Sequence, residues 1–345
     1  MSQFRGAIML KIIQDEQAIK RYQQQFIKSF KPFADEKIPV FLGHPGASIK
    51  VRVLWSGRLG IWFVSRKTDE GRYWNAFGTG KPKANATIPI TCEINFPVQG
   101  IDRRMGGALA KDFSGRVFVV HRGKLGGGKK GIGKSLFADH YRGVWDIMDD
   151  GDMETTVAVI GALQSPRLVR QATQFIHKVD KIKEMASSRS SQLEMAFDEI
   201  YFRETLVGER YCDLEKDKGA ECDHGLIVRD LSDHLKRQGF RVGNDGAHDL
   251  FIADAKGEIM TVFQIQTTCS PASLHSGATR LLLNSLRLSR TLRLILVIPE
   301  KPEPAIEEKL NKLHINTVAY EWNKDQASFP GLKSLLAAAK WADPP

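Results

Sequence analysis

The stretch "HDLFIADAKGEIMTVFQIQTT" (248–268) decides the fold of the C-terminal part of this chain. Two apolar runs are separated by a turn at Lys256–Gly257, a pattern typical of a β-hairpin. Side chains alternate along a strand, so Gln264 and Gln266 share one face of the second strand. Asp249 begins the first strand, and the start of one hairpin strand lies opposite the end of the other. We therefore expect Asp249, Gln264 and Gln266 to meet at one end of the hairpin.

The patterns around this hairpin predict a mixed sheet with helices packed against it. A helix is expected before the hairpin, because Ile227, Leu231 and Leu235 lie on one helical face and Gly239 follows. After the hairpin we expect a helix, a buried strand, a helix and a last strand, over about 277–289, 293–299, 303–313 and 315–322. A buried apolar strand that follows a helical crossover is typical of a mixed sheet with helices on its faces.

This arrangement resembles the PD-(D/E)XK, or restriction-endonuclease-like, superfamily over roughly residues 222–345. The element order is that of the family core, and the hairpin falls where the family motif falls. The resemblance implies that Asp249 binds Mg²⁺ (or Mn²⁺) and that Gln264 is the second metal ligand through its amide oxygen. It places Gln266 at the position of the family lysine, which supports the attacking water. Glutamine at that position departs from the family pattern and gives a variant D…QxQ motif.

The chemistry implied by this resemblance needs more than one carboxylate. Phosphodiester hydrolysis uses a cation that polarises the phosphate and activates a water molecule. Mg²⁺ prefers oxygen ligands and usually takes one or two carboxylates, with water completing the shell. We therefore expect a further acid from the first helix or its approach, Glu221 or Asp223, and a proton-transfer role for His224. The alternative is a degenerate site in a non-catalytic DNA-binding or scaffold protein.

The N-terminal part of the chain has a different pattern. Short aromatic and β-branched runs separated by Gly, Pro, Asn or Asp predict strands over about 49–55, 59–67, 72–78, 86–96 and 115–123. They indicate a β-rich domain, a barrel or a curved sheet. Helical spacing is found over 10–31, and a short helix is expected over 136–148.

These patterns predict a multidomain α+β protein. We expect a basic β-rich recognition domain over 1–150, a helical connector over 151–210 and the nuclease-like domain over 211–345. The connector is helical from about residue 154, with Ser165–Pro166 opening one helix and a second over 191–207. It is expected to position the C-terminal domain or to hold a homodimer together.

The charge of the chain favours a polyanionic partner. Lys and Arg number 50 against 40 Asp and Glu, giving a net charge of +10, and we expect DNA as the partner. A glycine- and lysine-rich stretch without acids, "HRGKLGGGKKGIGKS", spans residues 121–135. Glycine permits close approach of the backbone to a phosphate, and lysines release counterions. The predicted DNA-binding residues are Arg122, Lys124, Lys129, Lys130 and Lys134.

The same stretch matches a nucleotide-binding motif. Gly128–Ser135 reads "GKKGIGKS", which fits the G-x-x-x-x-G-K-[ST] phosphate loop. A phosphate loop starts directly where a buried strand ends, whereas seven residues separate Val120 from Gly128 here. A P-loop NTPase is therefore a second alternative to the nuclease.

The remaining features concern the compartment. The four cysteines include no CxxC pair, which favours a reducing compartment over a disulfide framework. The N-terminus lacks a signal-peptide pattern, and no apolar run has the length of a membrane span, so no membrane partner is expected. We predict a cytoplasmic, metal-dependent deoxyribonuclease whose sensor-plus-nuclease layout resembles restriction and phage-defence enzymes.

Overall fold

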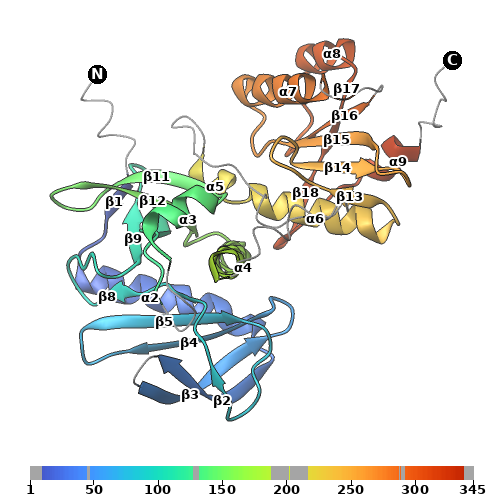
Figure 1. Cartoon of the computed structure of the whole chain (residues 1–345). Coiled ribbons are helices and arrows are strands. Elements are labelled where there is room, and N and C mark those ends of the chain that lie inside the picture. Colours follow the sequence, from blue (N-terminus) through green and yellow to red (C-terminus); the bar gives the residue numbers. More distant parts are fainter. Residues whose placement is uncertain are drawn as a thin grey trace. The chain divides into compact units, whose positions relative to one another are not determined.

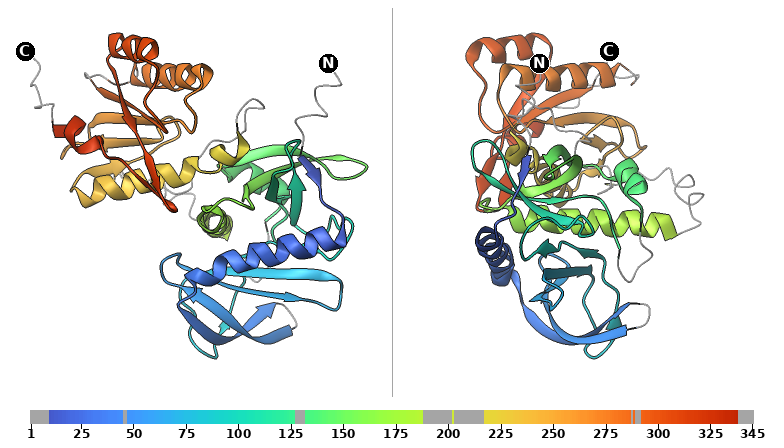
Figure 2. Two further views of the ribbon diagram at one scale, coloured as in Figure 1. Left: turned by 180° about the vertical axis from the view of Figure 1, so that it is seen from behind. Right: turned by 90° about the vertical axis from the view of Figure 1, so that its left-hand side faces the viewer.

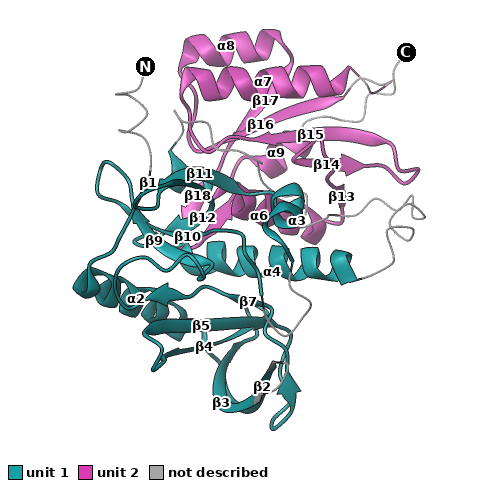
Figure 3. Cartoon of the chain, turned by 60° about the vertical axis from the view of Figure 1, so that its left-hand side comes forward, with its two compact units in different colours: residues 1–196, 209–222 teal, residues 197–208, 223–345 magenta. Residues whose placement is uncertain are grey.

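The computed structural model describes residues 10–44, 47–126, 132–187, 202, 217–286, 288 and 292–337. The chain divides into two compact units, shown in different colours in Figure 3. Unit 1 comprises residues 1–196 and 209–222, and unit 2 comprises residues 197–208 and 223–345. The described residues form helices and several sheets, which confirms the α+β class. No helix within the described ranges is long and apolar enough to cross a membrane.

The first layer of unit 1 is a seven-stranded sheet with the order β6-β2-β3-β4-β5-β7, in which β8 also pairs with β5. Its strands are β2 (Glu36–His44), β3 (Ala47–Ser56), β4 (Ile61–Lys67), β5 (Arg72–Thr79), β6 (Thr87–Ile88), β7 (Cys92–Glu93) and β8 (Phe96–Pro97). Alternation along the strands makes both faces apolar. Trp62 and Trp74 belong to the cluster on one face, and Phe63 and Phe77 belong to the cluster on the other.

The second layer of unit 1 is a closed five-stranded barrel with the order β1-β11-β12-β10-β9. Its strands are β1 (Leu10–Ile12), β9 (Gly107–Lys111), β10 (Val117–His121), β11 (Val144–Asp149) and β12 (Glu154–Ala162). Strand β1 completes the ring, because it pairs parallel with β11 and antiparallel with β9. Buried side chains from all five strands meet in one cluster, which includes Leu10, Ala110, Phe118, Met148 and Val157.

Two long helices fill the space between the sheet and the barrel, as Figures 1 and 2 show. The helices of unit 1 are α2 (Glu16–Phe30), α3 (Lys134–His140), α4 (Leu168–Ser187) and α5 (Lys218–Glu221), and a 3₁₀ turn, Lys31–Phe33, follows α2. The Asp15 carboxylate caps α2 by accepting a hydrogen bond from the Ala18 amide at 2.7 Å. Phe26 of α2 and Phe175 of α4 pack in the same cluster as Val119 of the barrel.

The β11–β12 hairpin corrects three sequence predictions. Strand β11 pairs with residues 154–159 of β12 over its whole length, so the predicted domain boundary at residue 150 falls inside a hairpin, and the connector is not helical over Glu154–Ala162. The helix predicted over 136–148 ends at His140, because Val144 begins β11. The helix predicted over 10–31 begins only at Glu16, after β1. Short apolar runs fit a helix or a strand, and pairing within the barrel decides these cases.

The later part of the predicted connector is helical where it is described. Helix α4 covers 168–187 and belongs to the core of unit 1. The second predicted helix, over 191–207, lies outside the described residues apart from Phe202. Over 151–187 the predicted connector therefore belongs to unit 1, whereas Phe202, its other described residue, packs against the core of unit 2.

Unit 2 contains a five-stranded sheet with the order β13-β14-β15-β16-β17. Its strands are β13 (Arg241–Gly243), β14 (Leu250–Ala253), β15 (Ile259–Ile265), β16 (Arg293–Ile298) and β17 (Ile315–Ala319). The first three strands are antiparallel, and β16 and β17 continue the sheet in parallel with β15. The element order predicted from the sequence for this region is confirmed.

Helices cover both faces of this sheet, as Figure 1 shows. The helices are α6 (His224–Arg237) on one face and α7 (Pro271–Ser285) and α8 (Pro304–Lys312) on the other, and the chain continues through β18 (Glu321–Asn323), β19 (Gln326–Ser328) and α9 (Leu332–Ala337). Leu231 of α6 packs with Phe263, whereas Leu274 of α7 packs with Val262 and Leu296. Because both faces are apolar, the central strands are buried, and the polar residues at their ends are exceptions in an apolar core.

Candidate functional site

The β14–β15 hairpin brings Asp249 and Gln264 into contact. Leu250 pairs with Phe263, so the residue before β14 lies opposite the residue after Phe263. Gln264 Nε2 donates a hydrogen bond to Asp249 Oδ2 at 2.5 Å, and the Ile265 amide donates to the same oxygen at 2.9 Å. The side chain of Gln264 is buried. Strand register and alternation are therefore sufficient to join these two residues.

The start of α6 supplies a third group at this carboxylate. His224 is the first residue of α6, and its Nε2 lies 3.2 Å from Asp249 Oδ2. Burial alone would raise the pKa of Asp249, but His224, the Ile265 amide and the charge of Arg280 together hold it below its ordinary value. Asp249 is therefore ionised at neutral pH. Its second oxygen, Oδ1, receives no hydrogen bond from the described residues, and its side chain is 16% exposed.

Gln266 does not join this group. Its Oε1 accepts a hydrogen bond from Ser273 Oγ of α7 at 2.7 Å, and its backbone amide donates to Val297 O at 2.8 Å. A Cβ atom on Gly277 would come within 2.8 Å of Gln266 Nε2, so α7 packs directly over this side chain. Gln266 shares the face of Gln264, as alternation requires, but it anchors α7 and makes no hydrogen bond to Asp249.

Helix α7 brings a cation that the sequence analysis missed. Four residues spaced four, three and four apart share one face of the helix: Ser273, Gly277, Arg280 and Asn284. One end of this face holds Gln266 through Ser273, and the other holds the loop before Asp249, because Asn284 Nδ2 donates to Ala247 O at 2.6 Å. Arg280 lies between these two attachments, which agrees with the effect of its charge on Asp249. The helical spacing of these four residues is visible in the sequence and could have predicted that Arg280 shares a face with Ser273.

Comparison with known proteins gives no family for this chain. No protein-family model, no curated protein and no solved structure matches it. The chemistry of the site therefore rests on its own side chains.

The donors at Asp249 do not fit a resident Mg²⁺ or Mn²⁺ ion. The described residues contain no group of three or more His, Cys, Asp or Glu side chains that could hold a metal. Gln264 turns its N–H₂ group toward Asp249, so its oxygen would face a shared cation only after the amide turned over. What remains is one carboxylate oxygen, Oδ1. A single carboxylate oxygen is suited to a cation that arrives bound to a phosphate and keeps most of its water ligands.

The two acids proposed to strengthen the site belong to different units. Glu221 is a buried residue of α5, which belongs to unit 1, so it is not among the residues that unit 2 assembles around Asp249. The chain passes from unit 1 to unit 2 between Cys222 and Asp223. Asp223 occupies the position before α6 and is buried. Of the three residues proposed from this region, His224 is the one with a described contact to Asp249.

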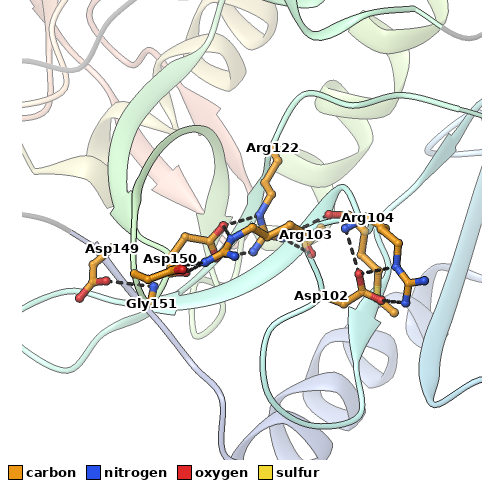
Figure 4. Close-up of polar contacts among 10 residues, drawn as sticks. Asp102, Arg103, Arg104, Arg122, Asp149, Asp150 and Gly151 are labelled. Carbon is orange, nitrogen blue, oxygen red and sulfur yellow. Dashed lines mark hydrogen bonds and ion pairs between the residues drawn. The ribbon is translucent and has the colours of Figure 1, made fainter.

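The structure corrects the predicted DNA-binding role of Arg122. This side chain is buried and forms a two-pronged ion pair with Asp150, with Nη2–Oδ1 and Nε–Oδ2 distances of 2.6 and 2.9 Å. Its Nη1 also donates to the carbonyl oxygens of Met105 and Gly107. Figure 4 shows Arg122 and Arg103 both directed at Asp150. Arg122 therefore ties the end of β10 to the turn after β11, and each of its three nitrogens already donates to a partner within unit 1.

In the described part of the glycine-lysine stretch, Leu125 and Ile132 form a β-bridge. The Ile132 amide donates to Leu125 O at 3.0 Å, and α3 then begins at Lys134. Lys124 and Lys134 are exposed. Lys129 and Lys130 lie outside the described residues, as does the first half of the predicted phosphate loop, Gly128–Ser135. In its described part this loop lacks the direct strand-to-loop connection of a P-loop.

Proposed function

We propose that unit 2 is a nuclease-like domain that hydrolyses phosphodiester bonds, and that the chain acts on DNA. The observation that supports this proposal is the ionised Asp249 carboxylate at the end of the β14–β15 hairpin, held on one oxygen by Gln264, His224 and the Ile265 amide. Its other oxygen, Oδ1, receives no hydrogen bond from the described residues, so it can accept one from a water molecule or bind a cation carried by the phosphate. A fixed anion beside a cationic residue is suited to orient a nucleophilic water against a phosphate.

Each side chain then has a distinct role. Asp249 Oδ1 orients the attacking water, and the His224–Asp249 pair accepts its proton as the new P–O bond forms. The bond to the leaving oxygen breaks, and that oxygen takes a proton from solvent. Arg280 binds non-bridging phosphate oxygens and stabilises the charge that develops on them. Arg280 thus supplies the positive charge that the family resemblance assigns to the lysine position, where Gln266 stands.

Unit 1 is the proposed DNA-binding part. The net charge of +10 and the exposed Lys124 and Lys134 support electrostatic attraction to a nucleic-acid backbone. Lys129 and Lys130 add two charges to the same stretch of sequence. In a cell the activity would be that of a cytoplasmic restriction or phage-defence endonuclease, working as a monomer or a homodimer.

The test is cleavage of a plasmid and of an oligonucleotide duplex over titrations of Mg²⁺ and of Mn²⁺, each repeated with EDTA. Wild type should cut, and Asp249→Asn should cut at least about 100-fold more slowly while its affinity for DNA stays within a few-fold. Arg280→Gln should also lose cleavage, whereas Lys309→Gln, which removes an exposed charge of α8, should not. Equal cutting by wild type and Asp249→Asn would place the active site elsewhere.

A second function is favoured by a specific observation. The lysine-equivalent residue Gln266 is buried against Ser273, and the described part of the site holds a single carboxylate, which suits a degenerate nuclease fold that binds DNA without cutting it. Salt-sensitive DNA binding with no cleavage of any substrate under either cation would support this second function. ATP hydrolysis lost in Lys134→Ala would instead support the NTPase alternative.

A further inference from the structure

Unit 1 contains a polar cavity that the proposed nuclease site does not use. It has a volume of about 450 Å³, within the range of about 300–1,000 Å³ typical of small-molecule sites. It lies beside the start of β5 and β7, and the segments before β9 and after β10 complete its wall. The residues that matter for its chemistry are Arg72, Glu93, Asn95, Arg104, Met105 and Lys124.

Two fixed polar side chains form the deep part of this cavity. Asn95 is buried, with 5% of its surface exposed, and its Oδ1 accepts a hydrogen bond from the Asn75 amide at 2.8 Å. Asn95 Nδ2 donates to Glu93 Oε2 at 2.6 Å. This leaves Glu93 Oε1 and the second N–H of Asn95 without a hydrogen-bond partner among the described residues. A ligand therefore meets a carboxylate acceptor beside an amide donor.

The backbone at Gly106 and Gly107, which lies against these side chains, is closely packed. A Cβ atom on Gly106 would come within 2.4 Å of His121 Nε2, and one on Gly107 would come within 2.6 Å of Asn95 O. His121 adds no charge here, because burial lowers its pKa to about 4 and keeps the ring neutral. Glu93 and Asn95 are thus presented on a rigid wall, and the carboxylate gives the deep part of the cavity its negative charge.

The cations of the cavity lie at its rim. Arg104 is 89% exposed and pairs with Asp102 at 2.9 Å, as Figure 4 shows. Arg72 pairs with Glu70 at 3.4 Å. Lys124 is exposed and forms no ion pair with a described residue. The cavity is therefore polarised, with an acceptor carboxylate inside and an unneutralised ammonium group outside.

We propose that this cavity binds a nucleotide, with the base against Glu93 and Asn95 and the phosphate at Lys124 and Arg104. The hydrogen-bonding edge of a nucleobase presents an N–H donor beside an acceptor, which complements a carboxylate next to an amide N–H. Met105 offers an apolar, polarisable contact for the face of the base. The phosphate extends outward to the cationic rim. The nucleotide is either free or a residue turned out of DNA, and the second source rests on the proposed function.

The test uses two probes with the full chain. The first is calorimetric titration with each of the four deoxynucleoside 5′-monophosphates. The second is a duplex carrying 2-aminopurine opposite a mismatch, whose fluorescence rises when the base leaves the stack. Binding of a mononucleotide alone identifies a free nucleotide as the ligand, and a fluorescence rise identifies a base turned out of DNA.

Two variants and one control make the result specific. Glu93→Gln replaces one acceptor oxygen by a donor, and Lys124→Ala removes the unneutralised rim charge. Each should weaken binding of the responsive probe about tenfold or more, whereas Lys111→Ala, an exposed charge on β9, should leave it unchanged. Thermal unfolding followed by circular dichroism checks that the Glu93→Gln variant folds. Because Lys124 is exposed, Lys124→Ala is expected to fold, and it keeps the test valid if Glu93→Gln fails to fold.

The proposal fails if neither probe responds to wild type, or if both variants respond as wild type does. The Asp249→Asn variant distinguishes failure of the nucleotide-binding proposal from failure of the proposed nuclease function. It should lose cleavage and retain the response of both probes, because Asp249 belongs to unit 2 and the cavity belongs to unit 1. Loss of the probe response in Asp249→Asn would also contradict the assignment to this cavity.

Discussion

Replacing Asp150 by Asn should strongly destabilise unit 1. The Arg122 and Asp150 side chains are 7% and 1% exposed, so the guanidinium would keep its charge in a buried place without a countercharge. Asparagine offers one acceptor oxygen, and its N–H₂ group would face one of the two Arg122 nitrogens that now donate to the carboxylate. Breaking a buried ion pair from one side costs about 3–5 kcal/mol of unfolding free energy.

Urea denaturation followed by tryptophan fluorescence measures this loss. Four of the six tryptophans, Trp55, Trp62, Trp74 and Trp145, lie in unit 1, so the signal reports mainly on that unit. With a urea dependence of about 2 kcal/mol per molar, a loss of about 3–5 kcal/mol lowers the midpoint by about 1.5–2.5 M. The slope of the transition should stay the same, because the surface exposed on unfolding is unchanged.

A matched control separates burial from ion pairing. Glu36 pairs with Lys81 in the same unit, but both side chains are about half exposed, so Glu36→Gln should cost less than about 1 kcal/mol. A shift for Asp150→Asn no larger than that for Glu36→Gln would refute the reasoning. Weakened DNA binding by Arg122→Met, without loss of stability, would restore Arg122 as a DNA-binding residue.

Three further predictions test other parts of the molecule. The combined change of Lys124, Lys129 and Lys130 to Ala should weaken DNA binding and lower the slope of log affinity against log salt by about one for each phosphate that is no longer neutralised, measured by fluorescence anisotropy. The lowered pKa of Asp249 stabilises unit 2 above the unfolded-state pKa of about 3.9, and this contribution is lost as the pH falls through the lower folded value. Chemical denaturation at pH 3 to 7 should therefore show a loss of stability in acid that is smaller in Asp249→Asn. Burial raises the pKa of Cys92 to about 12, so iodoacetamide at pH 8 should label it only in denaturant, as mass spectrometry would report.

The sequence predicted unit 2 better than unit 1 for a physical reason. In unit 2 the elements carry local signals: Gly239 with positive φ ends α6, and Ser270 caps α7, which begins at Pro271 and not near residue 277 as predicted. In unit 1 the segment Val144–Asp149 has the length and apolarity of a helical turn or a strand, and its state depends on β1, far away in the chain. Local patterns do not contain that pairing.

The site shows the same division between local and distant information. Alternation and register were sufficient to join Asp249 to Gln264, because both belong to one hairpin. The direction of Gln266 depended on Ser273 of the following helix, and the approach of Arg280 depended on how that helix lies across the strand ends. Arg122 lies in a stretch whose composition is typical of a DNA-binding loop. Its side chain is nevertheless buried against Asp150, which lies 28 residues later in the sequence.

The barrel of unit 1 has a consequence for the order in which the chain folds. Leu10 pairs with Met148, so the first described strand finds its parallel partner only after nearly the whole N-terminal half of the chain has been made. Contacts this distant in sequence form slowly, because a long loop must close before they stabilise anything. Until β1 has closed the ring, the edges of β9 and β11 that pair with it are open, and another chain could extend them. The interval between the synthesis of β11 and the docking of β1 is thus a period in which this protein is exposed to self-association.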